Sequence, residues 1–233
     1  ITPMQSIKEA EAVKIVENTY RDVNIAFVNE LAKSFSRMGI DIVNVIRGAA
    51  TKPFGFLPHY PGAGVGGHCI PVDPYYLIEY GRKNGFYHDF LMLARRINES
   101  MPRYTVDVLI SLLNNEGLPL KGTRVTVLGI AYKPDIDDTR ESPAFVIAEI
   151  LREYGGIVTM YDPHVASSDV SSLEEALTGA TAVVLATAHS AFQEELKPEQ
   201  LHKAGVRVFV DGHNTFSKQA FQEAGVRYRG IGR

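Results

Sequence analysis

The chain has 233 residues, of which 45% are hydrophobic and 22% are charged. This balance is typical of globular proteins and excludes global disorder. Lysine and arginine number 24 against 27 aspartates and glutamates, a formal net charge of −3, so the chain has no general attraction for nucleic acid or anionic membranes. No apolar run approaches the roughly 20 residues that span a bilayer. We therefore expect neither a nucleic-acid partner nor a membrane partner.

The lone cysteine and the first residue bear on cellular context. Cys69 has no partner for an intrachain disulfide, and the sequence shows no secretory apolar segment. Both features favour a reducing, cytoplasmic compartment. The chain opens with Ile1 rather than methionine, so we expect a fragment of a longer protein.

The first third of the chain has a helical pattern. Residues 7–38 are predicted to form one long helix, because apolar residues recur at spacings of three and four and form a stripe. The stripe consists of Val13, Val16, Tyr20, Val23, Phe27, Leu31 and Phe35. Gly39 is expected to end this helix, and a shorter one is expected over 40–50.

A loop rich in glycine and proline follows over residues 51–73. Loops of this length inside a compact domain are usually functional. A helix is expected to resume over 74–83, with Pro74 in its first turn. Residues 86–116 are predicted to form a second long helix that Pro102 kinks or interrupts.

From about residue 119 onward, strands alternate with helices. The predicted strands are 124–130, 157–161, 182–186 and 206–210, and the predicted helices are 142–154, 171–177, 198–204 and 217–224. This alternation predicts a doubly wound α/β domain with a parallel sheet and right-handed crossovers. We therefore expect a helical domain over 1–118 and an α/β domain over 119–233.

The glycine-rich stretch that ends in the only cysteine is the first candidate site. It reads Gly62-Ala-Gly64-Val-Gly66-Gly67-His68-Cys69. Glycines let the backbone approach a ligand closely and expose N–H donors. A helix beginning near Pro74 and the adjacent His68 would both lower the thiol pKa, which favours a reactive Cys69. The alternative is a buried cysteine that acts as a small hydrophobic residue in a structural turn.

Three polar residues are candidates to act with Cys69. Lys14 and Asn18 are one helical turn apart and therefore share a face, where they could stabilise an oxyanion. Each has an alternative place on a solvated helix edge. Asp73 could order a water molecule or accept a proton. Its alternative is to cap the helix predicted from Pro74.

The turn after the first predicted strand is the third candidate. Such a turn lies at the carboxyl edge of a doubly wound sheet, where ligands bind. It contains Gly129 but not the G-x-G-x-x-G pattern, so we do not assign a NAD site to it. Lys133 and Arg140 could hold a phosphate, although Arg140 could instead pair with neighbouring carboxylates. Ser142 is expected to cap the next helix, and we assign no metal ligands.

Four separated stretches share residues with one enzyme family, in the family's order along the whole chain. They are Glu11-Ala-Val-Lys14-Ile-Val-Glu-Asn18-Thr-Tyr with Asn29-Glu30; Gly64-Val-Gly-Gly-His-Cys69-Ile-Pro-Val-Asp73-Pro; Leu128-Gly-Ile-Ala-Tyr-Lys133-Pro-Asp with Asp138-Thr-Arg140-Glu-Ser142-Pro143; and Tyr228-Arg-Gly-Ile-Gly-Arg233. Together they resemble the UDP-glucose/GDP-mannose dehydrogenase family. The resemblance implies a helical central domain followed by a Rossmann-like UDP-binding domain.

The resemblance also implies a reaction, a four-electron oxidation of a sugar C6 alcohol to a carboxylate with NAD as cofactor. NAD would be held mainly by an amino-terminal domain that this chain lacks, so the chain alone would be inactive. Cys69 would form a thiohemiacetal and then a thioester. Lys14 and Asn18 would stabilise the oxyanions, and Asp73 would position or activate water.

The implied substrate contacts come from both domains. Those of the first are Phe56, Leu57 and Gly66, and those of the second are Lys133, Arg140 and His213. Many relatives carry arginine at the position of His213, which leaves its nucleotide contact open. The helix over 86–116 would support a homodimer; alternatively, its apolar residues belong entirely to the core of one chain.

The form of the cysteine loop resembles the N-acetylhexosamine branch of the family. It favours UDP-N-acetyl-D-mannosamine as substrate, with UDP-N-acetylglucosamine or UDP-glucose as alternatives. A different class of function also stays open, namely a module that binds a nucleotide sugar without catalysis.

Overall fold

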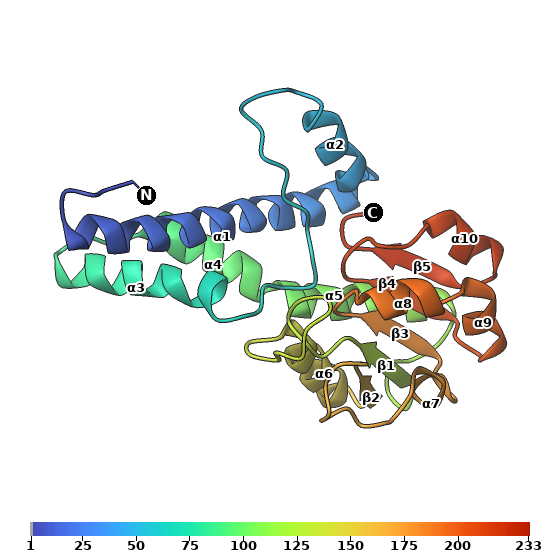
Figure 1. Ribbon diagram of the computed structural model, residues 1–233. Coiled ribbons are helices and arrows are strands. Elements are labelled where there is room, and N and C mark those ends of the chain that lie inside the picture. Colours follow the sequence, from blue (N-terminus) through green and yellow to red (C-terminus); the bar gives the residue numbers. More distant parts are fainter. Residues whose placement is uncertain (1) are drawn as a thin grey trace.

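The computed structural model describes residues 2–233, which form a helical part and a parallel-sheet part (Figure 1). The helical part contains α1 (Ile7–Met38), α2 (Ile42–Ala49), α3 (Cys69–Lys83) and α4 (Asp89–Glu99). Helices α3 and α4 both pack along α1, whereas α2 stands at the carboxyl end of α1. The predicted helical opening of the chain is confirmed.

The ends of α1 follow from local chemistry. The Ser6 side chain accepts a hydrogen bond from the Glu9 N–H and caps the first turn. Gly39 has a left-handed backbone, with φ of 71°, and its N–H donates to the Phe35 carbonyl. The predicted stop at Gly39 is confirmed, and the Asp41 side chain then caps α2.

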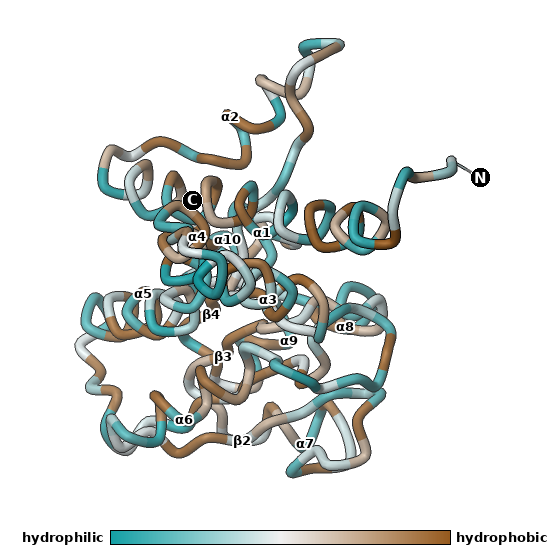
Figure 2. Tube along the Cα trace, turned by 90° about the vertical axis from the view of Figure 1, so that its left-hand side faces the viewer, coloured by the Kyte–Doolittle hydropathy of each residue, from teal (hydrophilic) through white to brown (hydrophobic). Residues whose placement is uncertain are grey.

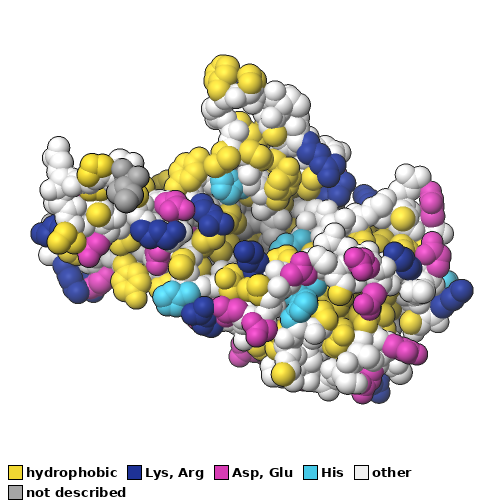
Figure 3. Space-filling view, in the orientation of Figure 1, with side chains coloured by type: hydrophobic (Ala, Val, Ile, Leu, Met, Phe, Trp, Pro, Cys, Tyr) yellow, Lys and Arg dark blue, Asp and Glu magenta, His cyan; other side chains and the backbone are white. Residues whose placement is uncertain are grey.

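Only the carboxyl end of the apolar stripe of α1, at Leu31 and Phe35, packs against the core of this chain. Val13, Val16, Tyr20 and Phe27 are each at least half exposed. Figure 3 shows hydrophobic side chains spread over the surface of the helical part. The buried face of α1 is mainly polar instead, and it includes Asn18, Thr19, Asp22 and Asn29. Most of the predicted stripe is therefore exposed in this chain.

Helix α3 begins earlier than the sequence predicts. The expected loop over 51–73 ends at His68, and Cys69 is the first residue of the helix. Pro71 lies in the first turn, where its missing N–H breaks no helical hydrogen bond. The expected start near Pro74 is therefore wrong. Asp73 lies inside α3 and does not cap it.

The predicted long helix over 86–116 is interrupted, as expected from Pro102. Helix α4 ends at Glu99, and α5 (Met101–Asn115) starts after the single residue Ser100, with Pro102 in its first turn. Val106, Leu109 and Leu113 of α5 are fully buried within this chain. For α5, the alternative that its apolar residues belong to the core of one chain is confirmed.

The second part is a five-stranded parallel sheet in the order β2-β1-β3-β4-β5. Its elements are β1 (Arg124–Leu128), α6 (Pro143–Glu153), β2 (Ile157–Tyr161), α7 (Leu173–Leu177), β3 (Ala182–Leu185), α8 (Ser190–Glu195), α9 (Pro198–Lys203), β4 (Val208–Asp211), α10 (Lys218–Glu223) and β5 (Arg227–Gly230). Every predicted strand and helix of this part is present. The sequence reading missed α8 and β5.

Both faces of the sheet are covered, so the predicted doubly wound α/β fold is confirmed. Val125 and Val127 of β1 pack into the core beneath α5 and α6, whereas Leu128 packs into the core beneath α7 to α10. Figure 2 shows the hydrophobic strands surrounded by more hydrophilic helices. Helix α5 packs on α6, β3 and β4, although it lies in the range 1–118 that we expected to form the helical domain.

The end of the chain returns to the helical part (Figure 1). The Ile42 N–H donates to the Gly232 carbonyl over 3.1 Å. Arg233 donates to Asp41 over 2.8 Å, and Arg229 donates to Ser36 over 2.8 Å. These contacts tie β5 to the junction of α1 and α2.

Across residues 2–233, every helix is either too short or too polar to cross a lipid bilayer.

The glycine-rich segment forms a second junction between the two parts. The Gly67 N–H donates to the Arg140 carbonyl over 2.9 Å. A Cβ atom placed on Gly66 would lie 2.7 Å from the Tyr132 Cβ and 2.8 Å from the Glu141 carbonyl oxygen. A Cβ on Gly67 would meet the Tyr132 ring at the same distance. The turn after β1 therefore packs directly on glycine backbone.

We expect Gly66→Ala to lower the free energy of unfolding by about 1–3 kcal/mol, because overpacking forces backbone shifts. Gly48→Ala is the matched control. A Cβ on Gly48, inside α2, meets no atom within 4 Å, so this variant should stabilise the chain by up to about 1 kcal/mol. Urea denaturation followed by circular dichroism measures both variants. Equal stability of Gly66→Ala and wild type would contradict the close packing at Gly66.

Candidate active site

Cys69 lies at the junction of the two parts of the molecule. It is exposed, and it is the first residue of α3. The amino end of a helix carries partial positive charge. The expected proximity of the thiol to a helix start is confirmed, although the helix begins at Cys69 itself.

Asn18 and Asp73 meet across the seam between α1 and α3. The Asn18 Nδ2 donates to the Asp73 Oδ2 over 2.6 Å, and Asn18 is 1% exposed. Asp73 also lies one helical turn after Cys69, so the two share a face of α3. The structure thus groups Cys69, Asp73 and Asn18, which the sequence separates by as many as 55 positions.

Lys14 is at the outer edge of this group. It precedes Asn18 by one turn of α1, and its Nζ pairs with the Glu17 Oε2 at 3.3 Å. Both side chains of that pair are about 60% exposed. Among the hydrogen bonds and ion pairs of residues 2–233, Lys14 contacts neither Cys69 nor Asp73.

Arg140 and Lys133 belong to the turn between β1 and α6. The Arg140 guanidinium forms a two-pronged contact with the carboxylate of Asp138, with a shortest distance of 2.6 Å. The expected pairing of Arg140 with a neighbouring carboxylate is therefore confirmed. Lys133 is exposed, and no hydrogen bond or ion pair of its side chain occurs within the described part of the chain.

The electrostatics link Arg140 to the thiol. Hydrogen bonding by Arg140 lowers the pKa of the Asp138 carboxyl from 3.8 to about 2. The same hydrogen bond, followed by the Asp138 charge, raises the pKa of Arg140, and Tyr132 and Cys69 contribute smaller amounts. The Arg140 guanidinium therefore lies within electrostatic range of Cys69.

The remaining candidates lie at different depths. Phe56 is partly buried against the main core, whereas Leu57 is 60% exposed. Gly66 packs on the turn after β1, so its lack of a side chain serves the junction. The His213 ring Nε2 lies 2.8 Å from the Ala186 carbonyl, and its backbone N–H donates to the Asp211 Oδ1.

Asp211 is a structural centre that the sequence reading missed. The Oδ2 of this buried carboxylate accepts hydrogen bonds from the backbone N–H groups of Thr215 and Phe216 and from the Tyr228 hydroxyl. Burial, followed by the Asp211 charge, raises the pKa of Tyr228. The available signal in the sequence was a carboxylate at the end of an apolar strand. In the structure, Asp211 holds the turn that contains His213.

A buried polar seam between α1 and α4 was also missed. The Asp22 Oδ1 accepts from Arg95 over 2.5 Å and from Asn98 over 2.8 Å. Asn29 donates to Asn98, and its own Oδ1 accepts from the Gly62 N–H over 3.0 Å. The seam therefore continues from α1 into the start of the glycine-rich segment. Its signal in the sequence was polar residues at helical spacing opposite the apolar stripe.

Comparison with known proteins follows the same division of the chain. Residues 8–100 match the description "UDP-glucose/GDP-mannose dehydrogenase family, central domain". Residues 126–218 match "UDP-glucose/GDP-mannose dehydrogenase family, UDP binding domain". The chain belongs to the UDP-glucose/GDP-mannose dehydrogenase family.

Relatives in the family support this membership. A UDP-N-acetyl-D-mannosamine dehydrogenase of Pyrococcus horikoshii is 39% identical over 96% of this chain and 52% of its own length. A UDP-N-acetyl-D-glucosamine 6-dehydrogenase of Pseudomonas aeruginosa is 39% identical over 86% of this chain and 48% of its own. The crystal structure of an NDP-N-acetyl-D-galactosaminuronic acid dehydrogenase of Methanosarcina mazei has a TM-score of 0.91 at 33% identity, over 98% of this chain and 51% of its own. The chain spans about half the length of the curated relatives it matches.

We expect Arg140→Gln to return the pKa of Asp138 from about 2 towards 3.8, because the stabilising guanidinium is gone. The sign follows from the lowered pKa. The ion pair is complete above the ordinary carboxyl pKa and is lost as pH falls through about 2. NMR titration of the side-chain carboxyl measures the midpoint.

Arg103→Gln is the control for this titration, since Arg103 pairs with Asp107 on α5. It should leave the Asp138 midpoint in place. An Asp138 midpoint unchanged by Arg140→Gln would show that the pair does not persist in solution.

Proposed function

We propose that this chain is the central and UDP-binding part of a nucleotide-sugar 6-dehydrogenase that oxidises the C6 alcohol of a UDP-N-acetylhexosamine to a carboxylate. The observation that supports this best is the placement of Cys69. Cys69 is the first residue of α3 and lies one helical turn before Asp73, which accepts a hydrogen bond from Asn18. It also lies at the junction with the domain that matches the family's UDP-binding domain.

UDP-N-acetyl-D-mannosamine is the substrate we favour, because the cysteine loop has the form of the N-acetylhexosamine branch. The names of two relatives are compatible with either epimer, mannosamine or glucosamine. UDP-N-acetylglucosamine is therefore the first alternative, and UDP-glucose is the second. The configuration at C2 separates the two N-acetylhexosamines, and glucose has a hydroxyl at C2 in place of their acetamido group.

The turn after β1 does not fit NAD. Gly129 is the only glycine between β1 and Ser142, and a Cβ on it would collide with the backbone of Thr187. This turn therefore lacks the glycines that let a dinucleotide pyrophosphate approach the backbone. We propose that NAD, the hydride acceptor implied by the family, is held by a part of the protein outside this chain.

Within this chain, Cys69 is the proposed nucleophile. Its thiolate would attack the C6 aldehyde and form a C–S bond, and the aldehyde oxygen would become an oxyanion. Removal of hydride from this thiohemiacetal leaves a thioester. Water then adds to the thioester carbonyl, the C–S bond breaks, and the carboxylate product and thiol are released. The covalent bond keeps the aldehyde from escaping between the two oxidations.

Asn18 and Lys14 are the proposed oxyanion stabilisers, and Asp73 is proposed to position the attacking water. The Asn18 amide uses one N–H for Asp73 and has a second N–H for an oxyanion. A donor of this kind is worth about 3 kcal/mol in a transition state. Lys14 would have to leave Glu17, which costs little because that pair is exposed.

The substrate would lie between the two parts of the chain. Lys133 and Arg140 are proposed to face the diphosphate, with His213 at the nucleotide end. Phe56 and Leu57 are proposed to line the sugar side, with Gly66 next to them. For the homodimer we propose the 86–116 region. Its large exposed apolar side chains are Phe86 and Tyr87, just before α4, and Phe90 and Leu93 within it.

A second candidate is a module that binds a nucleotide sugar without catalysis. The poor fit of the β1 turn for NAD favours it for the chain in isolation. Both candidates require UDP-sugar binding. They differ in the reactivity of Cys69.

This chain alone should bind UDP and UDP-N-acetylmannosamine in isothermal titration calorimetry and should produce no NADH from the sugar. Alkylation of Cys69 by iodoacetamide near neutral pH should be faster than that of a free cysteine peptide. A rate equal to that of the peptide would favour the non-catalytic module. Steady NADH production would overturn the assignment of NAD to another part of the protein.

In the complete enzyme, Cys69→Ser should block the second oxidation far more than the first, because a serine hydroxyl is a weak nucleophile at neutral pH. We expect the aldehyde to accumulate, which is detected by trapping it with hydrazine. The NADH yield per sugar should fall from two towards one. Asp89→Asn, on the surface at the start of α4, is the control and should keep the wild-type yield. A full yield from Cys69→Ser would refute the thioester route.

A further inference from the structure

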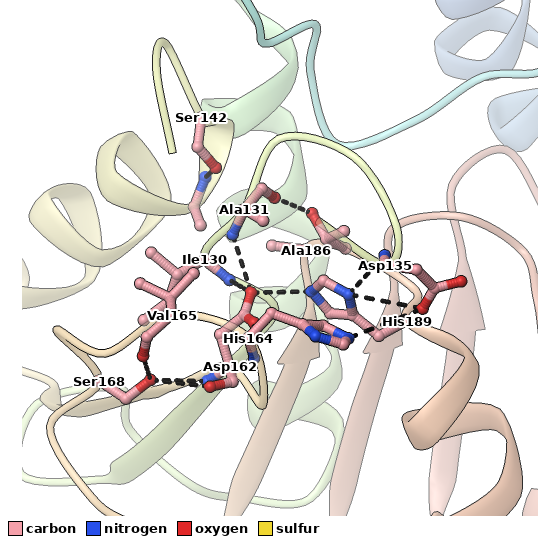
Figure 4. A network of polar contacts seen from close by, with 12 residues as sticks. Ile130, Ala131, Asp135, Ser142, Asp162, His164, Val165, Ser168, Ala186 and His189 are labelled. Carbon is pink, nitrogen blue, oxygen red and sulfur yellow. Dashed lines mark hydrogen bonds and ion pairs between the residues drawn. The ribbon is translucent and has the colours of Figure 1, made fainter. Parts of the chain in front are cut away.

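A buried Asp162–His189 pair connects three turns at the carboxyl edge of the sheet (Figure 4). Asp162 follows β2, and His189 follows β3. The Asp162 Oδ2 accepts hydrogen bonds from the backbone N–H groups of Ile130 and Ala131, at 2.7 and 2.8 Å. It also lies 2.8 Å from the His189 Nε2. His189 is completely buried and Asp162 is 2% exposed. The turn after β1 is therefore held by hydrogen bonds inside the protein.

The geometry determines which nitrogen of His189 carries the proton. The Asp135 backbone N–H lies 2.9 Å from the His189 Nδ1. A backbone N–H can only donate, so Nδ1 must be the acceptor. The proton is therefore on Nε2, which donates to Asp162. Burial by itself would raise the pKa of Asp162, but hydrogen bonds from His189 and from backbone N–H groups lower it.

Asp135 is held from its other side as well. Its carboxylate accepts from the Ser190 N–H at 2.8 Å and from the Ser190 hydroxyl at 2.7 Å. Its backbone φ is 60°, a left-handed conformation that needs such support in a residue other than glycine. The segment 130–135 is thus anchored at Ile130, Ala131 and Asp135.

The anchored segment contains two residues of the proposed site. Tyr132 packs on Gly66 and Gly67. Gly67 is two residues before Cys69 in the chain. Lys133 follows Tyr132 and precedes the anchored Asp135. A shift of this segment would therefore move Lys133 and loosen the junction beside the thiol.

We propose that Asp162 and His189 are positioning residues, which hold the 130–135 segment so that Lys133 can bind the diphosphate of a nucleoside diphosphate and Tyr132 can support the cysteine loop. The inference rests on the proposed function for its ligand. Neither residue touches substrate, and both act through the segment that they hold.

Asp135, His164 and His189 also bring three potential metal ligands within 4.8 Å of one another. The hydrogen bonds argue against a metal centre there. The His189 Nδ1 already accepts from Asp135, and both Asp135 carboxylate oxygens accept from Ser190. The single lone pair of the His189 Nδ1 is thus already used, which removes one of the three potential ligands, so the positioning role explains the cluster better.

His189→Leu tests the proposal, because a leucine side chain can neither donate to Asp162 nor accept from the Asp135 N–H, so both contacts of the ring are lost. In this chain, we expect UDP affinity measured by calorimetry to fall about tenfold, the usual effect of leaving such a group unpaired. Hydrogen exchange measured by mass spectrometry should accelerate in peptides covering 62–68 and 130–141. A peptide covering β4 should be unchanged.

Two further variants keep the test decisive. Ser190→Ala removes an exposed hydroxyl contact to Asp135 and does not disturb the buried Asp162–His189 pair. It should accelerate hydrogen exchange in 130–141 and lower UDP affinity by a smaller factor. Thr126→Val is the matched control, because it deletes a buried hydrogen bond from β1 to the Ala176 carbonyl. It should lower the melting temperature without changing UDP affinity or exchange in 130–141.

The outcomes separate this proposal from the proposed function. If exchange in 130–141 is unchanged in both His189→Leu and Ser190→Ala, or if Thr126→Val changes it equally, the positioning role is wrong. If the wild-type chain does not bind UDP but exchange responds as expected, the anchoring stands and the proposed ligand fails. Two-dimensional NMR of the His189 ring provides an independent check, since a proton on Nδ1 would overturn the hydrogen-bond assignment.

Discussion

The relative position of the two parts of this protein depends on one side chain, Tyr132, that packs against glycine backbone. Tyr132 occupies the space that side chains at Gly66 and Gly67 would need, and the Gly67 N–H donates to the Arg140 carbonyl. Cys69 follows within two residues, so its position depends on the α/β domain as much as on its own helix. Any ligand that moves the turn after β1 would therefore also move the thiol.

The helical part is held by polar contacts to a degree that is unusual for a bundle. Asn18 with Asp73, Asp22 with Arg95, and Asn29 with Gly62 form a line along α1. Such contacts fix the rotation of α1 more strictly than apolar packing does, because each donor needs its own acceptor. Removing one partner of a buried ion pair typically costs about 3–5 kcal/mol, so the seam limits how far α1 can turn.

Much of the fold could be predicted from local signals. Gly39, Pro102 and Ser142 mark element boundaries by their backbone chemistry, and all three are found where expected. The edge strand β5 was missed because alternating arginines hide its pattern, and α8 because it is short. The buried face of α1 could not be predicted, because periodicity shows which residues share a face but not which face other elements cover.

The sequence by itself determined the family motifs, the order of most strands and helices, and the placement of Lys14 and Asn18 one helical turn apart. That Cys69 and Asp73 also share a helical turn became clear only from the structure, in which α3 begins at Cys69. Only the tertiary structure decided that Asn18 meets Asp73 and that Asp162 meets His189. The reason is that a helical turn has a fixed geometry, whereas partners 27 or 55 positions apart meet only after whole elements have packed. The same packing decided that the polar face of α1 is buried and that most of its apolar stripe is exposed.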